Sequence, residues 1–129
     1  MTTHTDLIVT FVDDMFFNSK INSAAAECRR RIERIKSKEQ LEAIIENSPS
    51  LILIDLNSNR LDPVQTIEFL KSRAELKGIP IVSFVSHVQT DLITAARTAG
   101  CDYVLPRSVF TQSLKEIIAG DFSSLGRFV

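Results

Sequence analysis

Short and nearly continuous apolar runs recur along the chain, each bounded by residues that favour turns. Four are clear, at residues 7–12, 51–54, 81–85 and 103–105. Runs of this length are typical of strands in a parallel sheet that is covered on both faces, because neither face then needs polar side chains. The pattern therefore predicts four strands of such a sheet.

Helical periodicity occupies the intervals between these runs. We expect helices in the segments 16–27, 37–45, 62–74, 89–99 and 114–120. Ser37 and Gln40 have the spacing of a capping box, and Asp62–Pro63 is typical of an N-cap followed by proline in the first helical turn. Gly100 and Gly120 stand where the last two of these helices should end.

The Arg-rich segment Arg29–Ile35 is the remaining strand candidate. It has few apolar residues, which is typical of an edge strand, where charge discourages pairing with other chains. Strands then alternate with helices throughout, and such alternation favours parallel pairing with right-handed crossovers. The sequence predicts an α/β fold of the flavodoxin-like, doubly wound kind, with a five-stranded parallel sheet in the order 2-1-3-4-5 and helices on both faces.

Composition narrows the classes of function. The 129 residues suit a single domain, residues 1–129, with a core over about 6–120 and a short tail over 121–129. The formal net charge of −1 disfavours direct nucleic-acid binding, for which a domain is usually strongly basic. No apolar run approaches the roughly 20 residues that span a bilayer, and the N-terminus lacks the pattern of a signal peptide. We therefore expect no membrane association. Cys28 and Cys101 form no CxxC pair, so we expect free thiols and a cytoplasmic protein.

Acidic residues follow two of the predicted strands. Asp13 and Asp14 end the run at 7–12, and Asp55 ends the run at 51–54. In the order 2-1-3-4-5 these strands are neighbours, and ligands of such sheets bind outside the carboxyl ends of the strands. Three close carboxylates repel one another unless a cation is present, and oxygen ligands suit Mg²⁺. A carboxylate beside a divalent cation can attack phosphorus and form an aspartyl phosphate.

Each of these carboxylates also has a plainer interpretation. Acidic residues at strand ends are common as turn formers and as helix N-caps. For any one of the three, that role is the more frequent. For all three at adjacent strand ends, the acidic site is the favoured interpretation.

Several segments, taken in order, resemble the receiver domain of two-component response regulators. The acidic pair in Phe11–Asp14 resembles the opening motif of that family, and Leu51–Asn57 resembles its phosphoacceptor strand. Ile79–Val82 and Ala95–Val104 resemble its fourth strand, fourth helix and fifth strand. The resemblance covers about residues 6–120, and its specificity lies in the order and spacing of the motifs.

The resemblance implies a role for each acidic residue. Asp55 would be the phosphoacceptor, and Mg²⁺ would be held by Asp13, Asp14, Asp55 and the backbone carbonyl of Asn57. The phosphoryl group would come from a histidine kinase or a phosphotransfer protein. The domain would then act on a downstream protein target, or as a homodimer, by changing the face formed by its fourth and fifth segments. It would be a signalling domain and not an enzyme in the ordinary sense.

Two positions depart from the family pattern. Receivers usually carry Thr or Ser at the end of the fourth strand, where this chain has Val85, which cannot donate a hydrogen bond. The hydroxyl of Ser86 is a candidate replacement, although an N-cap or loop role suits it equally. The family's Lys before a cis-linked Pro is replaced by Arg107 followed by Ser108, a pair that does not favour a cis peptide. Arg107 keeps the positive charge and can bind phosphate through its fork, although the role of an ordinary surface arginine suits it equally. His87, in the following loop, is expected to face solvent.

Three other classes of function share features with this sequence. The main alternative is a phosphorylation-independent pseudo-receiver, an interaction module that switches through partner binding alone. A flavodoxin would need a phosphate-binding loop where this chain has Asp13 and Asp14, and an aspartate-dependent phosphatase would typically show Asp-x-Asp there. The tail from Asp121 to Val129 either packs on the domain or anchors a partner.

Overall fold

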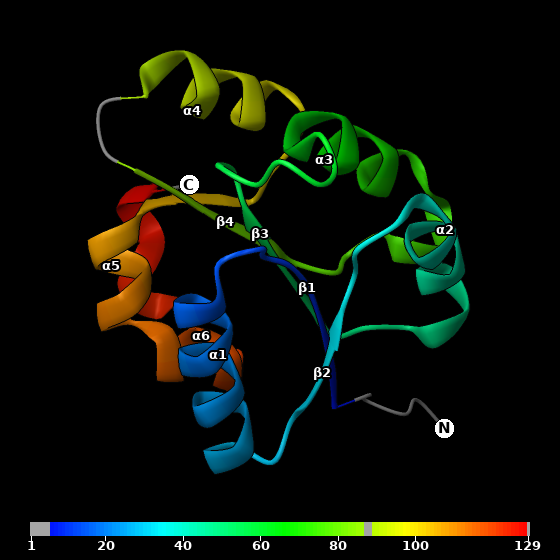
Figure 1. The fold of residues 1–129 in the computed structure, drawn as a ribbon. Coiled ribbons are helices and arrows are strands. Elements are labelled where there is room, and N and C mark those ends of the chain that lie inside the picture. Colours follow the sequence, from blue (N-terminus) through cyan, green and yellow to red (C-terminus); the bar gives the residue numbers. More distant parts are fainter. Residues whose placement is uncertain (1–5, 87–88, 129) are drawn as a thin grey trace.

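A five-stranded parallel sheet forms the middle layer of the fold (Figure 1). The computed structural model describes residues 6–86 and 89–128, so His87 lies outside the described residues. The strands are β1 (Leu7–Phe11), β2 (Arg31–Arg34), β3 (Leu51–Asp55), β4 (Ile81–Val85) and β5 (Tyr103–Pro106). They lie in the order β2-β1-β3-β4-β5. The predicted sheet order is confirmed, and the Arg-rich segment is indeed an edge strand.

Helices cover both faces of this sheet. They are α1 (Met15–Glu27), α2 (Lys38–Asn47), α3 (Pro63–Ser72), α4 (Thr90–Thr98), α5 (Arg107–Gln112) and α6 (Leu114–Ala119), with short 3-10 turns η1 (Ala74–Leu76) and η2 (Ser123–Phe128). Helices α1, α5 and α6 lie on one side of the sheet, and α2, α3 and α4 lie on the other (Figure 1). The prediction of a doubly wound α/β fold is therefore confirmed.

The apolar side chains divide into two cores, one on each face. Along β1, Leu7, Val9 and Phe11 join the core under α2 to α4, whereas Ile8 joins the core under α1, α5 and α6. This alternation is the period of a strand, and it explains why the strand sequences are apolar at nearly every position. Burial on both faces is the main term that holds the sheet together.

The helix ends follow the signals in the sequence. Ser37 Oγ accepts a hydrogen bond from the Gln40 N–H at 3.2 Å, and Asp62 Oδ1 accepts one from the Gln65 N–H at 3.0 Å. Both side chains satisfy N–H groups that have no partner within the helix. Gly120 ends α6 with a φ of 87°, a left-handed conformation that other residues adopt at a cost.

The segment after β5 differs from the expectation. Helix α5 starts at Arg107, directly after the strand, and is separate from α6, whereas only the later helix was predicted. Phe110 explains the extra helix, since its fully buried ring stacks on Phe84 of β4 with centroids 4.2 Å apart. The early start of α5 puts Arg107 at the head of a helix instead of at the end of a strand.

The tail packs back on the domain. Leu125 is fully buried in the core beneath α1, α5 and α6, and Phe122 stacks on Tyr103 of β5 with centroids 5.3 Å apart. The tail therefore packs on the domain as far as Leu125. Over the part of the chain that the structure describes, no helix is both long and apolar enough to cross a membrane.

Candidate functional site

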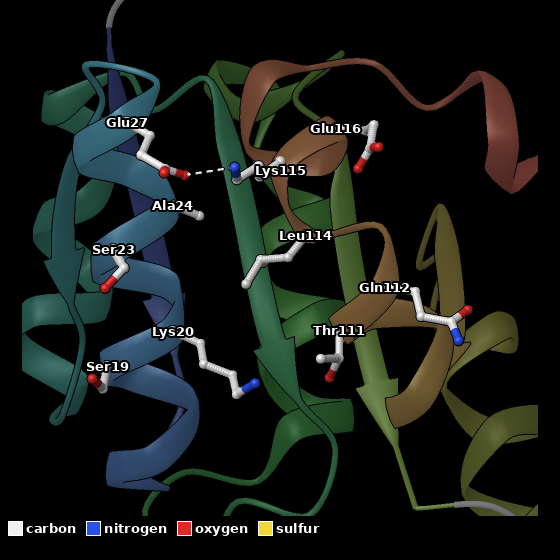
Figure 2. Close-up of a pocket in the computed structure, with 10 residues that line it drawn as sticks. All are labelled: Ser19, Lys20, Ser23, Ala24, Glu27, Thr111, Gln112, Leu114, Lys115 and Glu116. Atoms are coloured by element: carbon white, nitrogen blue, oxygen red, sulfur yellow. Dashed lines mark ion pairs between the residues drawn. The ribbon is translucent and has the colours of Figure 1, made fainter.

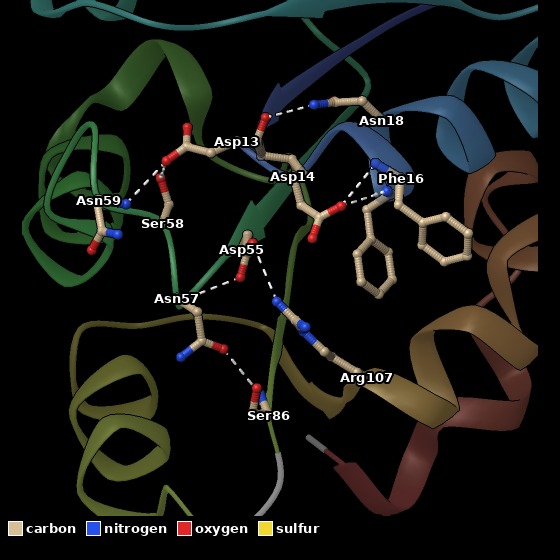
Figure 3. Close-up of polar contacts among 12 residues, drawn as sticks. Asp13, Asp14, Phe16, Asn18, Asp55, Asn57, Ser58, Asn59, Ser86 and Arg107 are labelled. Atoms are coloured by element: carbon tan, nitrogen blue, oxygen red, sulfur yellow. Dashed lines mark hydrogen bonds and ion pairs between the residues drawn. The ribbon is translucent and has the colours of Figure 1, made fainter.

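The three candidate carboxylates lie at one edge of the sheet (Figure 3). Asp55 is the last residue of β3, and Asp13 and Asp14 follow the end of β1. The two strands are hydrogen-bonded neighbours in parallel, with Phe11 paired to Ile54. The topology therefore brings these residues together from segments about forty positions apart in sequence.

Asp55 is a buried carboxylate. Its side chain is 4% exposed, and its Oδ1 accepts a hydrogen bond from the Asn57 N–H at 2.9 Å. Burial raises the pKa of Asp55, and the negative charges of Asp13 and Asp14 act in the same direction. The Asn57 hydrogen bond and the positive charge of Arg107 oppose that rise without cancelling it.

Arg107 faces Asp55 from the first turn of α5. Its Nη2 lies 3.8 Å from Asp55 Oδ2, which is an ion-pair distance but too long for a hydrogen bond. The guanidinium lies over the ring of Phe17, 5.0 Å from the centroid, so the α1 side of the core positions it. Arg107 Nε is buried and has no hydrogen-bond partner among the described residues. Arg107 thus places a positive charge near Asp55, and its Nε–H has no hydrogen-bond partner among the described residues.

Asp13 turns toward the loop that follows β3. Its Oδ2 accepts hydrogen bonds from Ser58 Oγ at 2.7 Å and from the backbone N–H groups of Asn59 and Arg60 at 3.0 and 3.3 Å. The Arg60 Nε lies 3.6 Å from its other oxygen. Although partial burial works in the opposite direction, these hydrogen bonds and the Arg60 charge lower the pKa of Asp13. Asp13 is therefore ionised and occupied by protein groups.

Asp14 has a structural task of its own. Its Oδ1 caps α1 by accepting hydrogen bonds from the N–H groups of Phe16 and Phe17 at 2.8 and 3.1 Å. This is the plainer role that the sequence also allowed. An N-cap uses one carboxylate oxygen, so the cap by itself leaves a second oxygen for another ligand.

The backbone of the acidic loop is held by two residues that sequence reasoning missed. The buried Asn18 donates from Nδ2 to the Val12 carbonyl at 2.9 Å, and Arg34 donates from Nε to the same oxygen at 3.0 Å. Arg34 also reaches the Asp13 carbonyl at 3.3 Å from the edge strand β2. A polar Asn on the buried face of α1 was the available signal for the first. Nothing in the sequence indicated the second.

The donor set fits a divalent cation in kind. The three carboxylates offer oxygen ligands of the kind that Mg²⁺ prefers, and such an ion would relieve the repulsion that Asp13 and Asp14 exert on Asp55. In their present positions, no three Asp, Glu, His or Cys side chains of the described residues are gathered into a metal-binding group. Asp13 and Asp14 instead accept hydrogen bonds from Ser58 and from Phe16.

The Asn57 side chain joins two loops. Its Oδ1 accepts a hydrogen bond from the Ser86 N–H at 3.0 Å, and its Nδ2 donates to Gln89 Oε1 at 2.7 Å. Val85 is buried at the very end of β4, as the sequence register predicts. The Ser86 hydroxyl makes no hydrogen bond within the described residues, so its backbone, not its side chain, is engaged near the site.

A separate hollow of about 440 Å³ lies between α1 and the α5–α6 segment (Figure 2). Polar side chains line most of it, and Glu27 and Lys115 bridge it with an ion pair of 3.1 Å. None of the predicted site residues lines it. The candidate site residues lie at the carboxyl ends of the strands and not in this hollow.

Solved structures provide the comparison with known proteins. No protein-family model matches the sequence. The chain is similar to the phosphorylated cyanobacterial phytochrome response regulator RcpA, with 20% identity, a TM-score of 0.73, and coverage of 98% of this chain and 97% of that one. It is also similar to the Mn²⁺-bound response regulator Rcp1, with 21% identity, a TM-score of 0.70, and coverage of 92% and 94%.

A third similar structure is the receiver domain of the sensor histidine kinase PA1611 from Pseudomonas aeruginosa PAO1, with a magnesium ion in its active-site cleft. It is 15% identical to this chain, with a TM-score of 0.74 and coverage of 88% of this chain and 94% of that one. The chain therefore has the fold of a response-regulator receiver domain.

Proposed function

We propose that this chain is a receiver-type signalling domain that accepts a phosphoryl group on Asp55 and acts through contacts with other proteins. The pairing of Asp55 with Arg107 carries the proposal. A buried carboxylate faces a guanidinium whose Nη2 is too distant for a hydrogen bond and whose Nε has no partner among the described residues. Phosphoryl oxygens are the natural ligands of such a guanidinium, because its planar fork matches their geometry.

The chemical step uses the oxygen that faces Arg107. Asp55 Oδ2 attacks the phosphorus of a phosphohistidine on a histidine kinase or phosphotransfer protein, and the bond from phosphorus to the donor's imidazole nitrogen breaks with its electron pair going to that nitrogen. Oδ1 stays with the Asn57 N–H, so the hydrogen bond orients the carboxylate for attack. Arg107 offsets the charge of the transferred group.

A divalent cation belongs to the same proposal. Asp13, Asp14, Asp55 and the Asn57 carbonyl would hold Mg²⁺, which when bound supplies positive charge that offsets the phosphoryl oxygens. Asp13 Oδ2 already accepts hydrogen bonds from Ser58 and from two backbone N–H groups, so Oδ1 would be the oxygen that holds the cation. Arg60 competes with the cation for Oδ1.

The surface beside the site suits a protein donor. Met15 and Phe16, the first residues of α1, are 69% and 66% exposed, and they are the large apolar side chains that stand out in solvent among the described residues. Exposed apolar residues next to a reactive group favour contact with a partner over contact with water alone. The proposal places the kinase or phosphotransfer protein at this end of α1.

One observation favours a second candidate function. Asp13 and Asp14 already have protein partners, and Val85 brings no hydroxyl to the site. A phosphorylation-independent pseudo-receiver would keep this arrangement permanently and recognise its partner through surface contacts. It predicts partner binding that is unchanged by Asp55→Ala.

The decisive experiment is phosphoryl transfer from a small donor. The protein is incubated with Mg²⁺ and acetyl phosphate and weighed intact by mass spectrometry. We expect one phosphoryl adduct on the native chain and on the control Asp121→Ala, whose carboxylate lies in the tail, and none on Asp55→Ala. An unmodified native chain would contradict the proposal and support the pseudo-receiver.

A further inference from the structure

The residue at the end of β4 has no hydroxyl group that could bind a phosphoryl group. Val85 ends β4 with an apolar side chain, and the Ser86 hydroxyl makes no hydrogen bond within the described residues. If Asp55 is phosphorylated, as proposed above, its state must reach the rest of the molecule by another route. The contacts of Asn57 offer one.

Asn57 is linked to Asp55 through its backbone and to the start of α4 through its side chain. Its N–H donates to Asp55 Oδ1 at 2.9 Å. Its side-chain amide accepts from the Ser86 N–H at 3.0 Å and donates to Gln89 at 2.7 Å (Figure 3 shows the contact with Ser86). A single residue thus connects the acidic carboxylate with the residues at either end of the β4–α4 connection.

Gln89 is the residue that precedes α4, and it is not used as a cap. The N-cap residue of a helix normally provides a side-chain acceptor for the first N–H groups of that helix. Gln89 makes no such hydrogen bond, and its side-chain oxygen accepts from Asn57 instead. The start of α4 is therefore held by the loop after β3 and not by its own cap.

Helix α4 is also the more easily moved of the two helices in contact on this side of the sheet. Only Ala96 is fully buried among its residues, whereas α3 buries Thr66, Ile67 and Leu70. A helix with few buried contacts costs little free energy to shift, so a small number of hydrogen bonds at its start can decide its position.

We propose that Asn57 is the positioning residue that couples Asp55 to α4, taking the place of the missing hydroxyl at the end of β4. Asn57 holds Ser86 and Gln89 while Asp55 Oδ1 accepts its N–H. A phosphoryl group on Asp55 Oδ2 draws negative charge away from Oδ1, so the hydrogen bond from the Asn57 N–H to Oδ1 weakens. The Asn57 backbone is then displaced. The side-chain amide then leaves Ser86 and Gln89, and the first turn of α4 is released.

Hydrogen exchange of the unmodified protein tests the clamp itself. Asn57→Ala should speed exchange of the Ser86 amide, and of the Ile93 amide that donates to the Gln89 carbonyl at 3.1 Å at the start of α4, by about tenfold, the factor that corresponds to losing a hydrogen bond of roughly 1.4 kcal/mol. Asn59→Ala is the matched control, because it removes the same side chain from the same loop, where it has no hydrogen bond among the described residues. Equal exchange in Asn57→Ala and Asn59→Ala would overturn the proposal.

The same measurement after treatment with Mg²⁺ and acetyl phosphate tests the coupling. Samples are compared at equal phosphoryl occupancy, read from intact mass. In the native chain, phosphorylation should speed exchange at Ser86 and α4. In Asn57→Ala it should add no further change, and in Gln89→Ala the change should be reduced, with Gln112→Ala behaving as the native chain.

The two proposals fail in different ways. A phosphorylation-dependent change in α4 that persists in full in Asn57→Ala would overturn the coupling while leaving Asp55 as phosphoacceptor. A native chain that takes up no phosphoryl group would overturn the proposed function and the coupling that rests on it. The exchange of the unmodified Asn57→Ala protein would still show whether the clamp exists.

Discussion

The ends of β1 and β3 differ from the ends of β4 and β5 in how closely they follow the receiver pattern. At the ends of β1 and β3, the acidic residues stand where the receiver resemblance implies, and each has a defined set of partners. At the ends of β4 and β5, Val85 lacks a hydroxyl, and the positive charge comes from Arg107 at the head of α5 instead of from the strand. The half that would accept a phosphoryl group follows the family pattern, and the half that would respond to it does not.

This difference separates chemistry from response. A charged group can be replaced by another that arrives from a different element, because the electrostatic effect depends on where the charge lies and not on which segment carries it. A hydrogen-bonding hydroxyl can be replaced only if another group makes an equivalent link.

Metal removal should have the largest effect on the acidic half. With EDTA, phosphoryl uptake from acetyl phosphate should slow by about 100-fold or more, because uncompensated carboxylates repel the incoming anion. The rate is followed by intact mass, and added excess Mg²⁺ should restore it. An uptake rate that EDTA leaves unchanged would mean that protein cations alone compensate the charge.

Substitution of Arg107 should have the next largest effect. Arg107→Ala should slow uptake by about 10- to 100-fold, a loss comparable to that of one donor at a developing negative charge. Arg107→Lys should recover part of the rate because it keeps the charge but not the fork. Thermal melts of both variants separate this effect from loss of the packing of Arg107 over Phe17. Equal rates in Arg107→Ala and the native chain would remove Arg107 from the site.

The competition at Asp13 predicts a smaller change in the opposite direction. Arg60→Gln should strengthen Mg²⁺ binding by about threefold, the scale of one exposed ion pair, because it removes a positive charge 3.6 Å from Asp13. Calorimetric titration with Mg²⁺ measures the affinity. The control Arg73→Gln, which breaks the exposed pair with Glu75, should leave it unchanged. Weaker binding in Arg60→Gln would contradict the competition.

The smallest predicted effect concerns stability. The pKa of Asp55 is raised in the folded state above its ordinary value of 3.8, so the ionised form is less favourable folded than unfolded. The associated stability is present below that ordinary value and is lost as pH rises through the folded pKa. Asp55→Asn removes the buried charge, and should raise the free energy of unfolding at pH 7 by about 0.5 kcal/mol.

Denaturant unfolding from pH 4 to pH 7 provides the measurement. The advantage of Asp55→Asn over the native chain should grow as pH rises across this window. For Asp13 the sign is reversed, since its pKa is lowered, and its contribution is lost as pH falls. An Asp55→Asn advantage that shrinks with rising pH would contradict the account of a destabilising buried carboxylate.

Much of the fold could be predicted from the sequence because the signals were local. Apolar runs marked the strands, and Ser37, Asp62 and Gly120 marked helix ends, each for a reason that depends on neighbouring residues alone. The separate α5 was missed because its main support, the stacking of Phe110 on Phe84, joins positions 26 residues apart. Short helices that depend on tertiary contacts leave a weak pattern in the sequence.

The sequence indicated which carboxylates would meet at the candidate site, but not which hydrogen-bond partners they would have. The parallel topology indicated that Asp13, Asp14 and Asp55 would meet at one edge. It carried no information on which partner each carboxylate takes, because Ser58, Arg34 and Asn18 reach the site from other loops, strands and helices. The clamp made by Asn57 depends on loop conformation, which spacing along the chain does not specify.

The central claim is that Asp55 is the phosphoacceptor, and direct mapping of the modified residue tests it. The protein is treated with Mg²⁺ and acetyl phosphate, reduced with borohydride, and digested for tandem mass spectrometry. An acyl phosphate on Asp55 is converted by reduction into homoserine, so the account predicts homoserine at position 55 and an unaltered Asp13 and Asp14. A phosphoryl group found on any other residue, or homoserine at another position, would contradict it.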